Sequence, residues 1–152
     1  MVAEKEGVGV YAVADGVGEH PRSEVAAGII GHVFKEAVEQ GRFHQKMGTR
    51  AVRRVIRNLI RGSIEVMDEV ARQEKEFERI SATFALAVLV NGRIYIAHIG
   101  DARVYLQLKD GALIQVTQDQ FYSKKTKEGL LIPRQIAQGR SAPKGGRPWN
   151  RR

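Results

Sequence analysis

The spacing of hydrophobic positions changes along the chain, and each spacing predicts a different element. Residues 7–14 carry apolar side chains at odd and even positions alike, which is typical of a strand buried on both faces. After Ser23 apolar residues recur at helical spacing until Gly41, and a longer helical region spans residues 48–79. The expected buried positions are Val25, Ile29, Val33 and Ala37 in the first helix and Val52, Ile56, Leu59, Ile60, Met67 and Val70 in the second.

Beyond residue 80 the apolar period becomes two residues, which predicts strands at residues 82–90, 93–99, 102–108 and 112–116. Asn91-Gly92 separates the first two strands and Lys109-Asp110-Gly111 the last two, and both sequences favour a tight reversal. The predicted order is therefore a strand, two helices and an antiparallel meander. That order indicates an α+β fold in which the helices cover one side of a sheet.

Composition limits the class of protein. The 152 residues are 43% hydrophobic, enough for one globular core. The absence of cysteine excludes a disulfide framework, a thiolate zinc site and a cysteine nucleophile. No apolar run approaches the ~18–20 residues that span a bilayer, and the first residues do not resemble a secretory signal. We therefore expect a soluble, cytoplasmic protein with no membrane partner.

The net charge of +8 is confined to the end of the chain. Residues 1–120 carry 16 basic and 16 acidic side chains, whereas residues 121–152 carry nine basic side chains against Glu128 alone. The second segment is also rich in Gly, Pro, Ser and Gln, a composition that favours flexibility. We therefore expect a folded domain over residues 1–120 and a basic, flexible tail over residues 121–152.

Two basic features leave alternatives open. The tail is either an unstructured extension or a site for an anionic partner: nucleic acid, a membrane surface or an acidic protein. Nucleic acid is disfavoured, because Trp149 is the only aromatic residue beyond Tyr122 and base stacking needs more. The arginines of the second helix form either a phosphate-binding face or a solvated surface paired with nearby carboxylates. They are Arg50, Arg53, Arg54, Arg57 and Arg61.

Two short stretches place oxygen donors beside predicted strands. Asp15 ends the first strand, and Gly16 leaves its carbonyl accessible, so the pair offers the hard oxygen ligands that suit Mg²⁺ or Mn²⁺. Asp-Gly is also an ordinary turn dipeptide. Asp101 and Arg103 lie at a break between two apolar strands, where they could simply pair across a turn. Asp119 follows the last predicted strand of the meander, and by itself it indicates no particular function.

Together these stretches resemble the PPM family, the PP2C-type metal-dependent protein serine/threonine phosphatases, in its bacterial form. In that family a strand runs into A-D-G-M-G-G-H-P, and a helix then opens with G-E-x-A. Residues 14–21 of this chain read A-D-G-V-G-E-H-P, and residues 23–26 read S-E-V-A. The match therefore includes the strand and helix context as well as the letters.

The later motifs of that family follow in the same order. The family has a G-T-T strand, then V-A-H-V-G-D-S-R-A-Y, then L-T-x-D-H. Residues 81–83 of this chain read S-A-T, residues 96–105 read I-A-H-I-G-D-A-R-V-Y, and residues 116–120 read V-T-Q-D-Q. The resemblance covers about residues 7–120, so we expect residues 1–120 to be a partial PP2C-like phosphatase domain.

The resemblance implies part of an α/β/β/α sandwich, in which two antiparallel sheets are flanked by helices around a centre of two Mn²⁺ or Mg²⁺ ions. These metals activate a water that attacks phosphoserine or phosphothreonine in a protein substrate. On the resemblance, Asp15 bridges the metals, the Gly16 carbonyl binds one of them, and Asp101 helps to hold a third, weaker metal. Structural positions near the site are His20, Arg103, which braces the turn, and Asp119.

Departures from the family pattern indicate a domain truncated at both ends. The family's upstream R-x-x-N-E-D segment has no match in the 14 residues before Asp15, and no aspartate follows Gln120. Glu19 replaces a family glycine, and Ala82 replaces a family threonine. We expect a thin, weakly binding metal shell, and missing strands that leave open edges and exposed apolar faces.

Two functions of different classes follow. The first is metal-dependent protein serine/threonine phosphatase activity, which the absent ligand motifs make doubtful for the isolated chain. The second is a non-catalytic PP2C-like binding module, or fragment, whose basic tail binds anions. The sequence indicates no oligomeric state.

Overall fold

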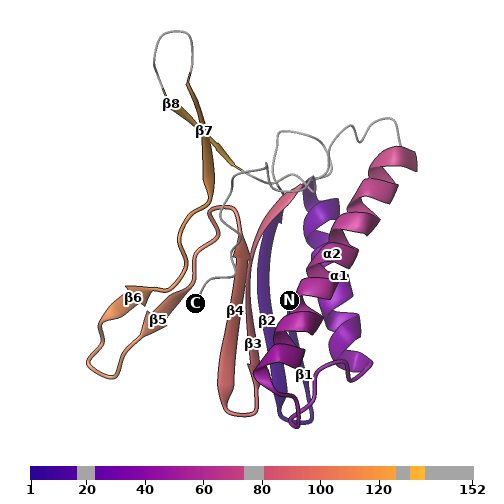
Figure 1. Cartoon of the computed structure of the whole chain (residues 1–152), viewed down its shortest axis with the longest axis vertical. Helices are drawn as coiled ribbons and strands as arrows, with labels where there is room; N and C mark the ends of the chain where they lie inside the picture. The colour runs from indigo at the N-terminus through magenta and orange to yellow at the C-terminus, as the bar shows by residue number, and fades with distance from the viewer. Residues whose placement is uncertain (17–22, 74–80, 126–130, 136–152) are drawn as a thin grey trace.

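The computed structural model describes residues 1–16, 23–73, 81–125 and 131–135. Four strands form an antiparallel sheet in the order β1-β2-β3-β4, and two helices cover one face of it (Figure 1). Two further hairpins, β5-β6 and β7-β8, form separate two-stranded sheets. The bounds are β1 Val2–Lys5, β2 Val8–Gly16, α1 Ser23–Glu39, α2 Thr49–Gln73, β3 Ala82–Val90, β4 Arg93–Ile99, β5 Tyr105–Gln107, β6 Leu113–Gln115, β7 Phe121–Lys125 and β8 Leu131–Gln135.

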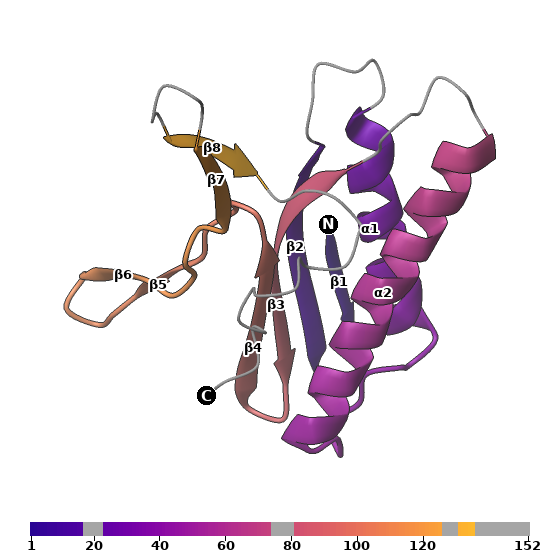
Figure 2. The same cartoon turned by 45° about the horizontal axis from the view of Figure 1, so that its top comes forward.

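The α+β prediction is confirmed, with both helices on the same side of the sheet (Figure 2). The predicted stop of the first helix is also confirmed. Gly41 has a positive φ of 67°, its N–H donates to the Val38 carbonyl, and the Arg42 N–H donates to the Ala37 carbonyl. This pair of bonds satisfies the last carbonyls of α1 and needs a residue that tolerates the left-handed region.

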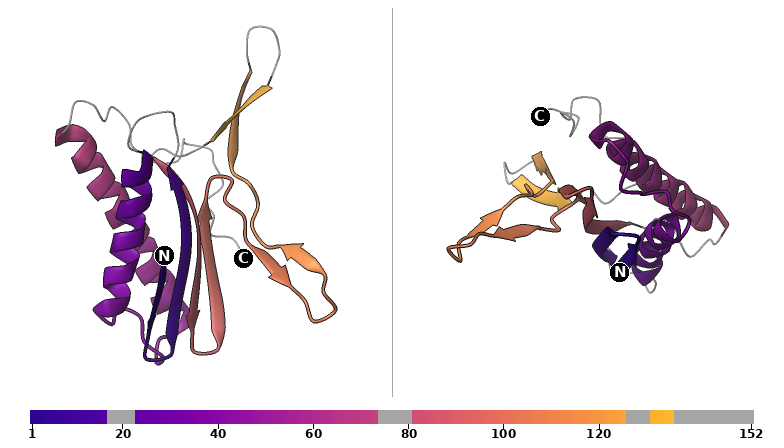
Figure 3. Two further views of the ribbon diagram at one scale, coloured as in Figure 1. Left: turned by 180° about the vertical axis from the view of Figure 1, so that it is seen from behind. Right: turned by 90° about the horizontal axis from the view of Figure 1, so that it is seen from below.

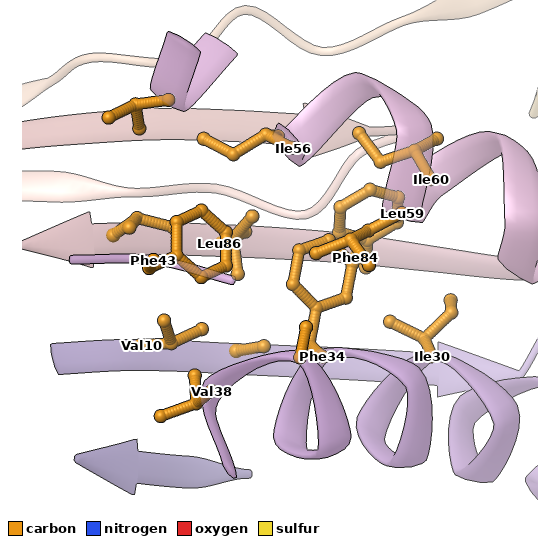
Figure 4. Close-up of a cluster of buried hydrophobic side chains, with 14 of the residues drawn as sticks. Val10, Ile30, Phe34, Val38, Phe43, Ile56, Leu59, Ile60, Phe84 and Leu86 are labelled. Atoms are coloured by element: carbon orange, nitrogen blue, oxygen red, sulfur yellow. The ribbon is translucent and has the colours of Figure 1, made fainter. Parts of the chain in front are cut away.

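The core lies between the helices and the sheet. Phe34 of α1 is fully buried, and it packs with Leu59 of α2 and with Phe84 of β3 (Figure 4). The predicted stripe of α2 is buried except for Val70, which is half-buried. The predicted stripe of α1 is correct for Ala37 and is displaced by one position for its other three residues. Its buried residues are Ala26, Ile30, Phe34, Ala37 and Val38, whereas Val25, Ile29 and Val33 are half-buried.

The N-terminal strand β1 was not predicted. It pairs with β2 through the two-residue turn Glu6-Gly7, in which both residues have positive φ. The four residues Val2–Lys5 are too few for their hydrophobic pattern to predict a strand. The predicted Asn91-Gly92 reversal is confirmed, because β3 and β4 pair up to Val90 and Arg93 and both turn residues have positive φ. Such turns match the twist of the strands that they connect.

Burial of β2 on both faces was predicted and is wrong. Val8, Val10 and Ala12 face the helices and are buried, but the opposite face, which we call the outer face, is open: Val13 is 73% exposed. Alternation along paired strands places every second residue there. The outer face consists of Val2, Glu4, Gly9, Tyr11, Val13, Asp15, Thr83, Ala85, Ala87, Leu89, Ile94, Ile96 and His98.

The predicted meander does not continue as one sheet. Strands β3 and β4 belong to the main sheet, whereas β5 and β6 form a hairpin that projects from it (Figure 3). The predicted reversal at Lys109-Asp110-Gly111 is confirmed: Gly111 has a φ of 88°, and the Ala112 N–H donates to Asp110. Both strands are shorter than predicted.

The predicted tail boundary at residue 120 stays a prediction. Within residues 121–152, the strands β7 and β8 pair with each other, with Phe121 opposite Gln135. The sequence pattern did not predict these strands. Residues 126–130 and 136–152 lie outside the described residues, as do residues 74–79 of the predicted second helix.

The outward surface of α2 is basic in its first half. Arg50, Arg53, Arg54 and Arg61 are exposed, and within the described residues none of the four has an ion-pair partner. The first turn of α2 contains no acidic residue. None of the helices in the described part is long and apolar enough to cross a membrane.

We predict that Phe34→Ala lowers the free energy of unfolding by about 3–5 kcal/mol, because it leaves a cavity between the two helices and the sheet. Urea denaturation followed by circular dichroism measures this loss. Val66→Ala is the matched control, because Val66 is 43% exposed on α2, and its removal should cost less than about 1 kcal/mol. Equal losses in the two variants would contradict the assigned core.

Candidate metal site

Strand β2 carries Asp15 and Gly16 to one end of the sheet. Both residues remain in the strand, where Asp15 pairs with Thr83 and Gly16 with Ala82. Asp15 is exposed on the outer face and Gly16 is half-buried, so the carboxylate and the neighbouring carbonyl are accessible from solvent. The alternative interpretation of Asp15-Gly16 as an ordinary turn is therefore wrong, because the backbone of both residues is extended.

The register brings the second motif to the same end. Phe84 of β3 pairs with Ile99 of β4, and the two strands are antiparallel, so Gly100, the residue after Ile99, lies beside Thr83. Thr83 in turn pairs with Asp15 of β2. Neighbouring strands lie ~4.8 Å apart, and β3 lies between the backbones of Asp15 and Gly100, so these two backbones are roughly 10 Å apart. Asp101 follows directly and is half-buried. Residues 86 positions apart in the sequence are thus gathered at one edge.

Gly100 permits this arrangement through close contact. Its φ is 83°, and a Cβ built on it would lie 2.5 Å from Thr83 Cγ2. Any other residue would clash with Thr83 and would also strain the backbone. The turn that presents Asp101 therefore rests directly against the strand that neighbours Asp15.

Two side-chain contacts fasten the segment after β6 to this turn. Gln120 accepts a hydrogen bond at Oε1 from the Gly100 N–H at 3.3 Å, and its own N–H donates to the Gly100 carbonyl at 2.9 Å. The Thr117 hydroxyl accepts from the Val104 N–H at 3.0 Å. The sequence analysis missed Thr117 and Gln120, although both lie in the V-T-Q-D-Q motif and the motif was their available signal.

Arg103 and Asp119 form the strongest polar contact nearby. Arg103 Nε donates to Asp119 Oδ1 at 2.9 Å, and its NH2 group donates to Oδ2 at 2.5 Å, which is bidentate pairing. Hydrogen bonding to Arg103 lowers the pKa of Asp119, and hydrogen bonding to Asp119 raises the pKa of Arg103. Both groups stay charged at neutral pH, and the pair joins the segment that precedes β5 to the segment that follows β6.

The donor set at this edge fits one hydrated ion better than two. Asp15 and the Gly16 carbonyl are hard oxygen donors, and Mg²⁺ is often held by one or two carboxylates with several waters. Within the described residues, however, no group of three or more His, Asp and Glu converges as a metal site. His20 lies outside the described residues. The metal roles of Asp15, Gly16 and Asp101 stay predictions, as do the structural roles of His20, Arg103 and Asp119.

Comparison with known proteins gives one family. The family model described as "Protein phosphatase 2C" matches residues 1–142. A protein phosphatase of Mycoplasma genitalium is 28% identical over 131 residues, which cover 81% of this chain and 50% of that protein. The serine/threonine protein phosphatase PstP of Mycobacterium tuberculosis is 27% identical over 128 residues, covering 84% of this chain and 24% of PstP.

Solved structures show the same fold. The serine/threonine phosphatase Stp1 from Staphylococcus aureus matches with a TM-score of 0.67 at 21% identity, covering 78% of this chain and 46% of Stp1. The M. tuberculosis PstP crystal structure matches with a TM-score of 0.61 at 24% identity, covering 80% of this chain and 52% of that structure. The chain thus spans half of the Mycoplasma relative and a quarter of PstP.

We predict that Gly100→Ala destabilises the protein more than Gly92→Ala does. Both glycines have positive φ, which costs an alanine roughly 1–2 kcal/mol, but only Gly100 also meets Thr83, whereas Gly92 faces open space. Thermal unfolding of the two variants measures the difference, and Gly92→Ala controls for the backbone strain. Similar melting temperatures would show that Gly100 and Thr83 are not in contact.

We predict that Arg103→Gln raises the pKa of the Asp119 carboxyl toward its ordinary value of 3.8. Because the folded-state pKa is depressed, the pair stabilises the fold above that ordinary value, and the stabilisation disappears as pH falls through the folded-state pKa. The wild-type protein should therefore melt higher than Arg103→Gln at pH 7, with the gap closing in acid.

NMR titration of the Asp119 carboxyl, with melting curves at several pH values, measures both effects. Arg72→Gln is the control, because it removes an exposed ion pair with Glu69 on α2 and should leave the pKa of Asp119 unchanged. An unaltered Asp119 pKa in Arg103→Gln would refute the assignment.

Proposed function

We propose, from the premise that the chain belongs to the protein phosphatase 2C family, that it serves metal-dependent hydrolysis of phosphoserine and phosphothreonine in proteins. The observation that carries the proposal is the meeting of two separate sequence motifs at one end of the sheet, Asp15-Gly16 from β2 and Gly100-Asp101 after β4. The names of the relatives agree with this reaction.

Each residue contributes a distinct part. The Asp15 carboxylate and the Gly16 carbonyl hold Mg²⁺ or Mn²⁺, and Asp101 holds a weaker ion nearby. When bound, these ions supply a water of lowered pKa as the nucleophile for in-line attack on the phosphomonoester. Arg103, already neutralised by Asp119, positions the turn of Asp101 and does not bind phosphate.

Charge balance limits what this edge does alone. Two divalent ions bring four positive charges, whereas Asp15 is the one carboxylate proposed to bridge them. We therefore propose that carboxylates outside the described residues complete the binuclear centre, and that the described part by itself binds a metal ion weakly.

A second function is favoured by the same sparse donor set. Within the described residues, no three metal-binding side chains converge, so a non-catalytic PP2C-like binding module is the alternative. Its predicted basic tail would supply affinity for an anionic partner. The two functions differ in whether a divalent ion binds at Asp15 at all.

We predict that Mn²⁺ binds this chain weakly and that Asp15→Asn abolishes the binding, because the substitution removes the one negative charge proposed to bridge the metals while keeping the shape of the side chain. Isothermal titration and Mn²⁺ electron paramagnetic resonance measure the binding. Hydrolysis of a phosphothreonine peptide, with Mn²⁺ and with chelator, tests for turnover in parallel.

Asp68→Asn is the matched control, because Asp68 is an exposed aspartate on α2, away from this edge. It should retain wild-type Mn²⁺ binding. Loss of turnover in Asp15→Asn together with metal binding in the wild type would support the phosphatase. Mn²⁺ binding that is unchanged in Asp15→Asn would refute the metal site and favour the binding module.

A further inference from the structure

The first half of α2 carries an uninterrupted basic surface. Residues 40–64 include seven basic side chains and no aspartate or glutamate. Five of the seven are the arginines of α2, which we call the arginine face: Arg50, Arg53, Arg54, Arg57 and Arg61. All but Arg53 are separated by four, three and four residues, so they form one row along the helix, with neighbours ~5–6 Å apart.

The arginine face is open to solvent. All of its residues except the half-buried Arg57 are exposed, and within the described part of the chain these four form no hydrogen bond or ion pair. Among the described elements, α2 packs against α1 and β4, and Figures 1 and 2 show no element in front of it. Pairing of these four arginines with nearby carboxylates is therefore not found among the described residues.

A further layer of the fold does not suit this face. Taking unpaired guanidinium groups out of water is strongly unfavourable, whereas the outer face of the sheet is apolar at its centre, with Val13 73% exposed. An additional layer supplied by a longer chain would therefore pack on the outer face, across the sheet from the helices. The arginine face stays at the surface, where a negatively charged partner can reach it.

The side chains around the arginines distinguish between the classes of anionic partner. A helix that binds a membrane surface inserts exposed apolar side chains beside its basic ones. On α2, Val66 alone among the large hydrophobic residues is exposed, and it lies beyond the arginines. Single-stranded nucleic acid needs aromatic side chains for base stacking, and α2 contains none. An acidic protein segment requires neither feature.

The spacing of the row suits carboxylates on another helix. A helix with Asp or Glu at intervals of four, three and four residues also presents them ~5–6 Å apart, and this order is the same in both chain directions. A second copy is a poorer match. Its α2 offers Glu65, Asp68 and Glu69 against five arginines, and Glu69 already pairs with Arg72 at 3.3 Å. The occupant that fits is therefore an acidic helix of another protein.

The arginine face begins at the other end of the sheet from the candidate metal site. Arg93, the first residue of β4, donates from a guanidinium nitrogen to Thr49 Oγ1 at 2.9 Å, and Thr49 is the first residue of α2. From there the seven residues of β4 span roughly 20 Å before Gly100. A protein bound at the arginine face leaves the edge with Asp15 open, so this inference does not depend on the proposed function.

We propose that the arginine face docks an acidic helix of a partner protein, whose Asp or Glu side chains form a row that matches the row of four arginines. Arginine suits this role, because its planar guanidinium can donate two parallel N–H bonds to one carboxylate. Docking also relieves the repulsion among the arginines, so the bound partner stabilises α2. Arg53, beside the row, adds attraction without a carboxylate of its own.

Fluorescence anisotropy with two labelled peptides of about 20 residues, long enough to form a helix, tests the proposal. Both peptides consist of four glutamates among alanines and glutamines. The matched peptide has its glutamates at intervals of four, three and four residues, whereas the scrambled peptide distributes them around the helix. The full chain should bind the matched peptide about fivefold more tightly. Because both peptides carry the same charge, attraction to the predicted basic tail is equal for the two.

Removing charge from the row should weaken this binding. The triple variant Arg50→Gln, Arg54→Gln and Arg61→Gln should bind the matched peptide about tenfold more weakly than the wild type, because three of the four pairs in the row are lost. Raising the salt concentration from about 50 mM to about 300 mM should also weaken wild-type binding, since dissolved ions screen exposed charges.

A second triple variant is the matched control. The changes Lys5→Gln, Lys35→Gln and Lys109→Gln remove three positive charges from exposed positions on β1, α1 and the β5-β6 turn. This variant should bind the matched peptide within about twofold of the wild type, because none of its altered side chains meets the peptide. Far-UV circular dichroism establishes that both variants fold, and glutamine is about as good a helix former as arginine.

Four outcomes would overturn the proposal. Equal binding of the two peptides would show attraction by net charge alone, and equal losses in the two triple variants would place the anion-binding site away from α2. Tighter binding of an oligothymidylate or of phosphatidylserine vesicles, abolished by the arginine changes, would assign the face to nucleic acid or to a membrane. A wild-type dimer in sedimentation velocity that the arginine changes dissociate would make a second copy the occupant.

Discussion

The register of β2 against β3 is the constraint on which both the core and the candidate site depend. Val10 pairs with Val88 and Asp15 with Thr83, and alternation places the first pair on the face that the helices cover and the second pair on the outer face. A slip of one residue would exchange these faces, burying a carboxylate against Phe34 and exposing the core valines. Burial of the helix-facing positions therefore fixes the place of Asp15, although Asp15 itself contributes nothing to that core.

Elements with a local signal were predictable from the sequence. Asn91-Gly92 has the backbone freedom that its turn requires, Gly41 ends α1, and the stripe of α2 follows from helical spacing alone. Strand β1 was not predictable in this way, because Val2–Lys5 is short and mostly exposed. The error in α1 has a similar origin. Adjacent apolar pairs such as Ile29 and Ile30 define two stripes equally well, and only the position of the sheet selects one.

The candidate site likewise has features that the sequence predicts and features that depend on contacts between distant parts of the chain. Resemblance to a family identified Asp15 and Asp101, and the hairpin at Asn91-Gly92 already implied that β3 and β4 would be neighbours. Pairing of β2 with β3 spans the two helices, so no local pattern could place Asp15 beside Thr83. The bonds of Gln120 to Gly100 and of Asp119 to Arg103 are also non-local, since they close around a hairpin whose direction the sequence does not encode.

The basic first half of α2 has an energetic consequence for how this helix forms. The N-terminal end of a helix carries partial positive charge, and Arg50 and Arg53 add to it with no acidic residue in the first turn. Repulsion among these guanidinium groups further disfavours the isolated helix. Helix α2 is therefore held by Val52, Ile56 and Leu59 against the sheet and not by its own electrostatics. Dissolved anions that screen its arginines should make the whole domain more stable as ionic strength rises.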